Sequence, residues 1–496
     1  MVEITIANLK ADLKTPKEVF YMGTLQAVAA KQVDTVDMDK FFNPASVAVI
    51  GASNVAFNLG ATICKILSDE AVGYRGRLYA VNRAGADVFG AKGCRSLDEI
   101  SDPIDLVVII TPAFIVPELI RKCGEKGIQN IVIESSGFSE AGPEGKRLQS
   151  EVDEAARPYS MRIIGPNCLG ILDNHSRFCC MFGANELAPK AVQHQGLVSY
   201  IVQSGGIGGL IVERLLDDVS GINKMVSLGN KSDLDEAEFI DYFDGDKTRV
   251  IALYLESVKD GRKLMQAARR TKKPVLVYKT GKSEAGSAAV LSHTAGMAQN
   301  DPVFDGACRQ AGMIRLRTPE ELYTLPKMLT EMPLLPGKRI AVFTNSGAFG
   351  TIGADMLSET DLVMAPFSEE TKARLKKLPG VFNASNPVDI GPAPPDVYLE
   401  IYRILLSAGE VDGILHMVSM WRDYVTDVME ALIRLCRQYQ KPAAMYAFSA
   451  LDRLRAAQLE KGLPLFGEVE DAVRALVVSY HQYSYLQKKE EPLWNK

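Results

Sequence analysis

The amino-acid sequence predicts an α/β protein made of several doubly wound domains, in each of which helices cover both faces of a largely parallel sheet. Short, nearly continuous apolar runs such as SVAVIGAS, from residue 46, alternate with helix-compatible segments such as ATICKILSDE, from residue 61. Strands that are apolar on both sides are usually buried on both sides, as they are in parallel sheets. The 496 residues are enough for about three domains of ordinary size.

Residues 1–40 are expected to form a polar N-terminal extension, and the first domain is expected to cover residues 41–175. The strands of this domain are predicted in four apolar runs, which are SVAVI from residue 46, LYAVN at 78–82, LVVIITP at 106–112 and NIVIESSG at 130–137. Helix-compatible segments separate the runs, so each pair of strands reads as a βαβ unit. This pattern is typical of a Rossmann-like sheet.

A second domain is predicted over residues 176–332 and a third over residues 333–496. Both continue the alternation of apolar runs and helices, with VSYIVQ, KMVSLGN, RVIALYLES and PVLVYKTG in the second and RIAVFT, GILHMVSMW and PAAMYAFS in the third. The two domains also share a local pattern, since VQSGGIGG and FTNSGAFG both run from a strand through Ser-Gly into a helix. We therefore expect two related doubly wound domains after the first.

The composition narrows the class of function. Lys and Arg total 56 and Asp and Glu total 61, a net charge of −5, which gives no sign of a nucleic-acid-binding or membrane-surface protein. The eight cysteines are scattered without metal-ligand spacing, so no metal site is expected. No apolar stretch reaches the roughly 18 residues of a membrane span, and the first residues do not resemble a signal peptide. We expect a cytoplasmic protein.

The first candidate site is the loop that follows the first predicted strand, in VIGASNVAFNLG. Gly51, Ala52 and Ser53 lie where the strand meets a helix, and free N–H groups at a helix start attract phosphate groups. The loop lacks the second glycine of a G-x-G-x-x-G fingerprint. The next strand ends in Asn82 and Arg83, where an NAD site needs an acidic residue and where Arg83 suits a ribose phosphate. NAD, CoA or a purely structural turn each remain possible on these residues.

The second candidate site is Ser204, Gly205 and Gly206, at the start of the helix in VQSGGIGG. Backbone N–H groups at such a position can hold an anion, although a structural turn is an equally good explanation. The flanking residues do not match the G-x-S-x-G elbow of a serine hydrolase, because Val202 precedes Ser204 by two positions.

Among the five histidines, His293 stands apart because small residues surround it in VLSHTAGMAQND. Such surroundings leave space for a ligand or for movement of the imidazole ring. Glu256 ends the apolar run LYLES, and a carboxylate there could fix one imidazole nitrogen and leave the other nucleophilic. Asn167 and Cys168, in IIGPNCLGIL, fit either a domain corner or a site.

Taken together, the motifs resemble a known family. They are FFNPASVAVIGAS, YAVNRAG, IDLVVIITPA, GFSEAGPEG, RIIGPNCLGI, SYIVQSGGIGG, SLGNKSDLDEAEFIDYF, LYLESVKDGRKL, KTGKSEAGSAA, SHTAGMAQND, RQAGMIRL, VFTNSGAFG and NPVDIG. In this order the chain is similar to the α subunit of ADP-forming acetate–CoA ligase and, more distantly, to that of succinyl-CoA synthetase. The resemblance runs from about residue 41 to about residue 477.

The resemblance implies a CoA-binding Rossmann-like domain followed by two flavodoxin-like domains. It implies a reaction in which acyl-CoA and phosphate give acyl phosphate and CoA, after which the phosphoryl group passes to a histidine and then to ADP. That histidine would be His293, Glu256 would steady it, and Ser204, Gly205 and Gly206 would bind phosphate. The CoA site would be lined by Gly51, Ala52, Ser53, Arg83, Ile133, Glu134, Ser135, Asn167 and Cys168.

The same resemblance implies a separate ATP-grasp β subunit that binds ADP or ATP with Mg²⁺, and an α2β2 assembly. The loop SHTAGMAQ departs from the SHTGALAG common in the family, which leaves the acyl substrate open. The alternatives are a catalytically silent CoA- or acyl-CoA-binding regulator and a nicotinamide-dependent oxidoreductase. The sequence does not reveal the carboxylic acid, the choice of ADP or GDP, the physiological direction or the role of the extension.

Overall fold

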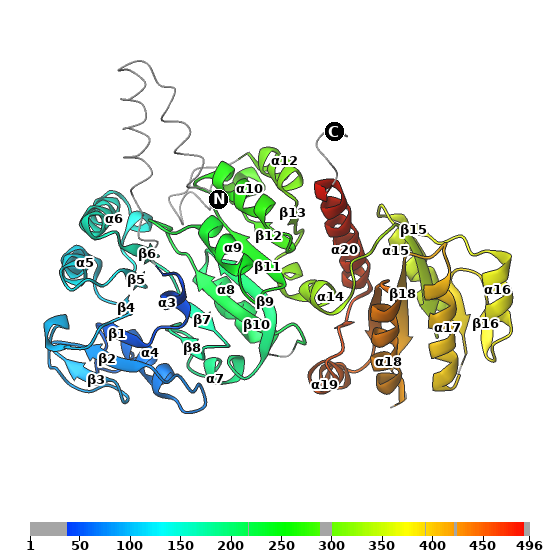
Figure 1. Ribbon diagram of the computed structural model, residues 1–496, viewed down its shortest axis with the longest axis horizontal. Helices are drawn as coiled ribbons and strands as arrows, with labels where there is room; N and C mark the ends of the chain where they lie inside the picture. The colour runs from blue at the N-terminus through cyan, green and yellow to red at the C-terminus, as the bar shows by residue number, and fades with distance from the viewer. Residues whose placement is uncertain (1–36, 217, 288–299, 392, 421–423, 491–496) are drawn as a thin grey trace, which may run out of the picture. The chain divides into compact units, whose positions relative to one another are not determined.

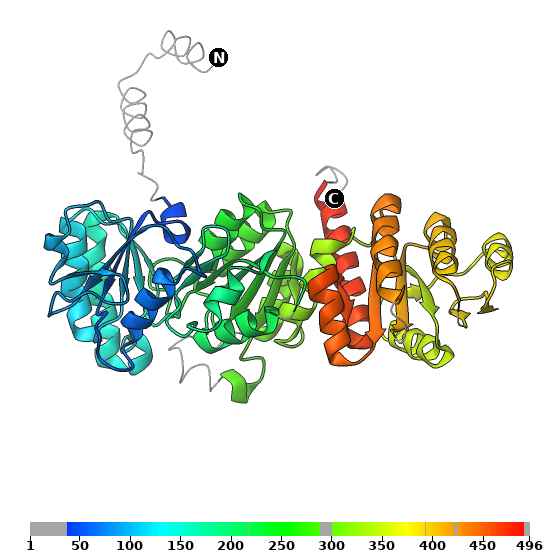
Figure 2. The ribbon, with the colours of Figure 1, turned by 90° about the horizontal axis from the view of Figure 1, so that it is seen from below.

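The computed structural model describes residues 37–490 except 217, 288–299, 392 and 421–423. The described strands form three sheets, all within the compact unit that begins at Met38 (Figure 1). Helices lie on both faces of each sheet (Figure 2). The predicted α/β class is therefore confirmed.

The first sheet is fully parallel, with strand order β3-β2-β1-β4-β5-β6. This order, with its reversal between β1 and β4, is that of a Rossmann fold. The strands are β1 Ser46–Ile50, β2 Arg77–Val81, β3 Lys92–Cys94, β4 Leu106–Ile109, β5 Asn130–Ile133 and β6 Arg162–Ile164. The helices are α3 Asp39–Phe42, α4 Leu59–Ser68, α5 Val116–Glu125 and α6 Pro143–Ala156, with short 3₁₀ turns at Leu97–Glu99, Ala113–Ile115, Ser139–Ala141 and Arg157–Tyr159.

Alternate residues of β1 face opposite sides of the first sheet. Val47 and Val49 belong to the hydrophobic cluster that includes α3 and α4, whereas Ala48 and Ile50 belong to the cluster that includes α5 and α6. Every side chain of β1 is buried, which explains why residues 47–50 are all apolar rather than alternating with polar residues.

The second sheet has strand order β13-β12-β11-β9-β10-β7-β8. Its five parallel strands follow the flavodoxin order 2-1-3-4-5, and β7 and β8 add an antiparallel edge. The strands are β7 Ile171–Asp173, β8 Phe178–Cys179, β9 Gln195–Val202, β10 Ile222–Ser227, β11 Val250–Leu255, β12 Val275–Lys279 and β13 Met313–Arg315. The helices are α7 Ala188–Ala191, α8 Gly205–Leu215, α9 Glu236–Asp244, α10 Gly261–Arg270, α12 Asp301–Ala311, α13 Glu321–Thr324 and α14 Pro326–Glu331.

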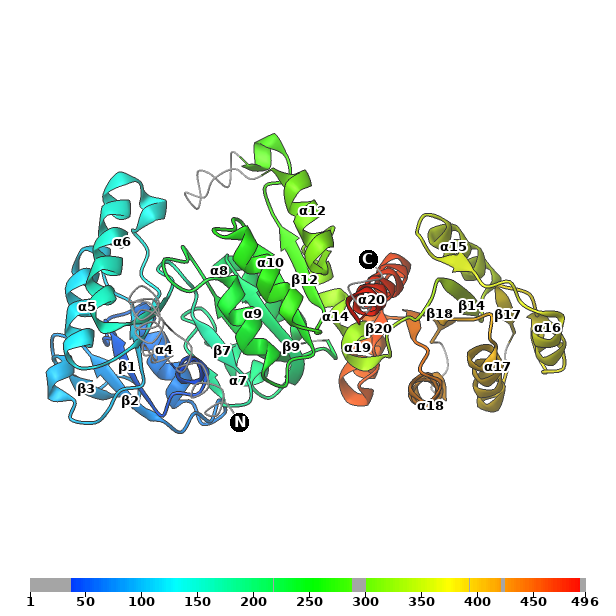
Figure 3. The same cartoon turned by 45° about the horizontal axis from the view of Figure 1, so that its top comes forward.

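The third sheet repeats the flavodoxin order in β17-β14-β18-β19-β20, with β16 antiparallel at one edge and β15 paired to β14. Helices α15 and α20 cover one face and α17 and α18 the other (Figure 3). The strands are β14 Arg339–Thr344, β15 Val363–Met364, β16 Val381–Asn383, β17 Val388–Ile390, β18 Gly413–Ser419, β19 Ala443–Phe448 and β20 Leu465–Phe466. The helices are α15 Gly347–Ser358, α16 Glu369–Lys376, α17 Pro395–Ser407, α18 Tyr424–Tyr439, α19 Leu451–Lys461 and α20 Val469–Glu490.

Two structural details bear on the sequence-based expectations. The antiparallel strands β7 and β8 lie on either side of residues 175 and 176, where the boundary between the first two domains was expected, and both pair within the second sheet. No helix in the described part of the chain is long and apolar enough to cross a bilayer.

Candidate functional site

A cavity of about 960 Å³ lies at the carboxyl ends of strands from the first and second sheets. Its walls include Thr111 after β4, Ser135 after β5, Ser204 after β9 and Glu256 after β11. Open parallel sheets bind ligands at this edge, because the loops there converge and helices begin there. The described residues that line the cavity include no Lys, Arg or His side chain, so within this part of the chain an anion would be bound by backbone N–H groups and neutral polar side chains.

Helix α8 supplies such groups at one wall. Ser204 is its N-cap, and in the described structure no side-chain hydrogen bond from Ser204 caps the helix. A Cβ atom added at Gly206 would meet only the Ser204 Oγ, at 3.9 Å, among the described atoms. The free N–H groups of the first turn, together with the helix dipole, can therefore approach an anion without obstruction.

Gln203 fixes the position of Glu256 relative to this helix. Its Oε1 accepts hydrogen bonds from the backbone N–H groups of Glu256, at 2.9 Å, and Ser257, at 3.0 Å, and its Nε2 donates to Ser257 Oγ at 3.0 Å. Gln203 and Glu256 are both buried and both line the cavity. Gln203 was not predicted as a site residue, although it is a polar residue that directly follows an apolar strand and precedes Ser204, which is a pattern that could have indicated its role.

A buried lysine joins two of the strand-end loops that line the cavity. Lys231 is fully buried, and its Nζ donates to Glu236 Oε2 at 3.0 Å and to the Ser257 carbonyl oxygen at 2.6 Å. It directly follows Asn230, a residue of the cavity wall, so the ammonium group connects the loop after β10 to the loop after β11.

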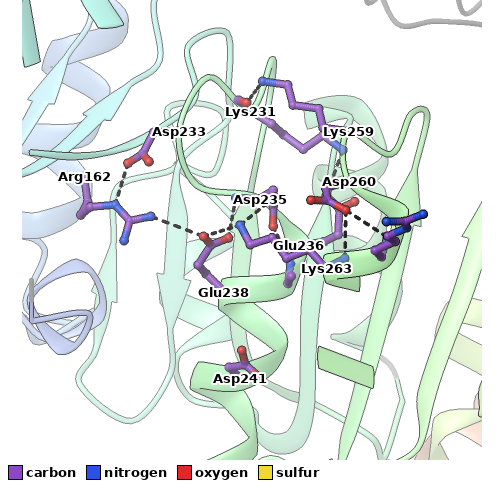
Figure 4. Close-up of polar contacts among 12 residues, drawn as sticks. Arg162, Lys231, Asp233, Asp235, Glu236, Glu238, Asp241, Lys259, Asp260 and Lys263 are labelled. Carbon is purple, nitrogen blue, oxygen red and sulfur yellow. Dashed lines mark hydrogen bonds and ion pairs between the residues drawn. The ribbon is translucent and has the colours of Figure 1, made fainter. Parts of the chain in front are cut away.

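Further ion pairs hold the same loop in place (Figure 4). Arg162 Nε donates to Asp233 Oδ2 at 2.9 Å, and Lys263 Nζ pairs with Asp235 Oδ2 at 3.0 Å. Asp235 also caps α9, in a capping box with Glu238. The wall around Asn230 is therefore supported by charged residues of both domains.

The loop from Gly165 to Gly170 lies between the end of β5 and the loop after β10, where the Asn230 N–H donates to the Pro166 carbonyl oxygen at 2.9 Å. The backbone N–H of Asn167 donates to the Ser135 carbonyl oxygen at 2.9 Å, and Ser135 Oγ accepts from the Thr111 N–H at 2.9 Å. Cys168 Sγ donates to the Ile133 carbonyl oxygen at 3.3 Å, and burial raises the pKa of the Cys168 thiol well above its ordinary value. At neutral pH the thiol is therefore uncharged.

The sequence can now be set beside known proteins. Residues 45–174 match the family model described as a CoA binding domain, and residues 195–329 match the one described as a succinyl-CoA ligase like flavodoxin domain. The chain is 36% identical to the α subunit of acetate–CoA ligase [ADP-forming] II of Pyrococcus furiosus, over 88% of this chain and 96% of that one. The chain belongs to this family of ADP-forming ligase subunits.

Two further relatives support the membership. The acetate–CoA ligase [ADP-forming] of Methanocaldococcus jannaschii is 38% identical over 71% of this chain, which covers 49% of that longer protein. The solved structure of dinucleotide-forming acetyl-coenzyme A synthetase 1 of Candidatus Korarchaeum cryptofilum, in complex with phosphate and ADP, superimposes with a TM-score of 0.81 at 28% identity. It covers 92% of this chain and 99% of that chain. The resemblance inferred from the motifs is confirmed, and the chain is a subunit of an acid–thiol ligase.

The structure of this ligase subunit brings part of the expected site together. The cavity wall contains the expected residues Ser204, Gly205, Gly206, Glu256, Glu134, Ser135, Asn167 and Cys168. His293 lies outside the described residues.

The other expected CoA-site residues are not among the lining residues of the cavity. Gly51, Ala52 and Ser53 form the turn between β1 and α4, where Asn58 Oδ1 accepts from the Ser53 N–H at 3.1 Å. Arg83 is exposed after β2. The Ile133 side chain is fully buried in the core beneath α5 and α6, so only its backbone could contact a ligand.

Proposed function

We propose that this chain is the α subunit of an ADP-forming acyl-CoA synthetase. The enzyme interconverts acyl-CoA, ADP and phosphate with a carboxylic acid, CoA and ATP. The observation that best supports this is that loops of a CoA-binding domain and the uncapped start of α8 line one cavity. A site that handles both CoA and phosphate needs this juxtaposition.

The proposed reaction brings phosphate, at the start of α8, and the thioester of acyl-CoA together in this cavity. Phosphate bound at Ser204, Gly205 and Gly206 attacks the thioester carbonyl carbon, the C–S bond breaks, and CoA leaves as the thiol or thiolate. The acyl phosphate then passes its phosphoryl group to a neutral nitrogen of His293, which releases the carboxylate. Imidazole suits this relay because its neutral form is nucleophilic near pH 7.

Three features of the chain assist these steps. Oriented N–H groups at the start of α8 stabilise the charge of the transferred phosphoryl group without reorganising. Glu256, held by Gln203, orients the imidazole of His293 through one ring nitrogen. The loops at Gly51, Ala52, Ser53 and Arg83 hold the nucleotide end of CoA, while Asn167 and Cys168 lie near the thioester.

The final phosphoryl transfer requires a nucleotide site on a partner. The Methanocaldococcus ligase is about twice as long as the segment that matches this chain, and the Pyrococcus relative is named as an α subunit. We therefore propose an ATP-grasp β subunit that binds ADP or ATP with Mg²⁺, in an α2β2 complex within the cytoplasm.

The proposal is tested by assaying the complex with its β subunit for acyl-CoA formation from ATP, CoA and a panel of carboxylic acids. ADP, and not AMP, should appear in proportion to acyl-CoA. Gly206→Asp places a carboxylate at the expected phosphate position, where the added Cβ has room, and should lower the rate at least about a hundredfold.

The matched control is Gly261→Asp, in the first turn of α10. A Cβ there would meet nothing within 4 Å among the described atoms, and Gly261 is not part of the cavity wall. This variant should keep the wild-type rate. A folded Gly206→Asp variant with full activity would contradict the proposed phosphate site, and a complex that binds CoA without turnover would favour the regulator instead.

A further inference from the structure

Glu134 is a buried acid of the cavity wall to which the proposed reaction assigns no role. It follows β5, is only 4% exposed, and lines the cavity. Neither carboxyl oxygen has a hydrogen-bond partner of acceptable geometry among the described residues. A buried polar group without a partner is costly, so one that persists at a cavity wall is a candidate for contact with a ligand.

The surroundings of Glu134 favour a neutral carboxyl group. Burial raises its pKa well above the ordinary value of 4.5, and the nearby Cys180 thiol offsets this only in part. The carboxyl group also lies close to the thiol of Cys168, which burial keeps uncharged, so no charge of opposite sign there favours a carboxylate. No Lys, Arg or His side chain of the described lining stands ready to pair with a carboxylate. A neutral carboxyl group can donate one hydrogen bond and accept others.

Glu134 is also connected to the phosphate end of the cavity. A Cβ added at Gly170 would lie 2.6 Å from Glu134 Oε1, so a glycine there makes room for the carboxyl group. The neighbouring Leu169 packs against α8, because a Cβ added at Gly205 would lie 3.3 Å from Leu169 Cβ. The consecutive residues Leu169 and Gly170 therefore connect the start of α8 to Glu134.

The acyl chain of the substrate must extend from the carbon that phosphate attacks, so it must occupy this cavity. Much of the wall suits an alkyl chain, with Leu169, Met181, Phe182, Leu187 and Leu210 among its residues. Glu134 places one polar group within that wall. An alkyl chain alone would leave the carboxyl group unsatisfied, which is the basis on which polar sites reject apolar analogues.

We infer that Glu134 is a specificity-determining residue that hydrogen-bonds a hydroxyl group on the acyl chain, so that the preferred acid is a short hydroxy acid. This inference rests on the proposed function, since it concerns the acyl group of that same reaction. A second carboxylate on the acid fits less well, because the described lining offers it no cation. An ammonium group would require Glu134 to ionise in a buried position, which is costly.

The test uses the full chain in complex with its β subunit and measures binding by calorimetry. The probes are CoA, butyryl-CoA, succinyl-CoA and the 2-, 3- and 4-hydroxybutyryl-CoA thioesters. The wild type should bind at least one hydroxybutyryl-CoA about tenfold or more tightly than butyryl-CoA, as one well-made hydrogen bond allows.

Two variants separate hydrogen bonding from charge. Glu134→Leu should remove the preference for hydroxybutyryl-CoA over butyryl-CoA, measured as the ratio of the two dissociation constants in the same variant. Glu134→Gln keeps a neutral donor and acceptor of the same size, so it should retain most of the preference. A carboxylate that paired with a cation would instead lose its effect in both variants.

The outcomes distinguish a failure of the proposed function from a failure of the proposed role of Glu134. If folded wild-type complex binds no CoA, the proposed function fails and the inference fails with it. If CoA and acyl-CoA bind but the wild type favours butyryl-CoA or succinyl-CoA, the inference alone is overturned. It is also overturned if Glu134→Leu keeps the preference for the hydroxyl group.

Discussion

Replacing Lys231 by methionine should destabilise the chain severely. The lysine side chain is fully buried and Glu236 is 2% exposed, so the substitution leaves a buried carboxylate without its cation. Breaking a buried ion pair from one side costs about 3–5 kcal/mol. The Ser257 carbonyl oxygen loses its donor as well, which adds about 1 kcal/mol.

The double variant Lys231→Met/Glu236→Leu isolates the cause of that loss. It removes both charges and fills the space with apolar atoms, so it should be more stable than Lys231→Met by about 2 kcal/mol or more. The free energy of unfolding would be measured by urea titration, with the slope of each transition compared with that of the wild type. A loss below about 1 kcal/mol in Lys231→Met, or strictly additive effects in the double variant, would refute this reasoning.

A matched lysine separates stability from function. Lys224 is also buried, and it pairs with Asp173 at 3.2 Å and Asp246 at 2.9 Å, but it does not line the cavity or join its loops. Lys224→Met should destabilise the chain yet leave the activity of the folded fraction near that of the wild type. Lys231→Met should lower both, because Glu256 and Ser257 lose their anchor to the loop after β10.

Three further predictions concern single residues. Gly51→Ala should destabilise the first domain by at least about 2 kcal/mol in urea titration, because φ is +100° and the new Cβ would lie 2.3 Å from the Ile110 carbonyl oxygen; a neutral substitution would contradict this. Burial lowers the pKa of His416 from 6.5 to about 3, so the free energy of unfolding is unaffected by this group above pH 6.5 and falls as the pH drops toward 3, by on the order of 5 kcal/mol in total. His416→Phe should flatten that dependence, and an equally steep one would exclude His416 as its cause. Burial raises the pKa of Glu134, so the folded chain keeps a proton that the unfolded chain releases above pH 4.5, and stability falls as the pH rises. The stability of Glu134→Gln relative to the wild type should therefore increase from about pH 5 to about pH 8, and a constant difference would show that the carboxyl group is ionised.

The fold class followed from the sequence because buried parallel strands have an unmistakable pattern. Residues 47–50 of β1 are apolar at every position, since helices cover both faces of the sheet. The antiparallel edge formed by β7 and β8 was not anticipated. These strands have three and two residues, too few to show a period. They are defined by pairing, of β7 with β10 and of β8 with β7, rather than by their own composition.

The site was predictable only where a local motif marked it. The glycines after Ser204 and the acid that ends β11 stood out in the sequence, and both line the cavity. Gln203 and Lys231 did not stand out, because their roles depend on partners about 53 and 26 positions away. Glu134 was expected only as one of several CoA contacts, and its lack of a partner is a property of the folded chain.

The most direct test of the proposed function is phosphoryl transfer to this chain. The complex would be incubated with γ-labelled ATP and Mg²⁺, and the label on the α subunit would be tested for the acid lability and base stability of phosphohistidine. The control variants are His293→Ala and, for a histidine elsewhere in the second domain, His194→Ala. We predict label on the wild type and on His194→Ala, none on His293→Ala, and loss of the label when CoA and a suitable acid are added. An active complex whose α subunit carries no label, or a label that survives His293→Ala, would contradict the relay.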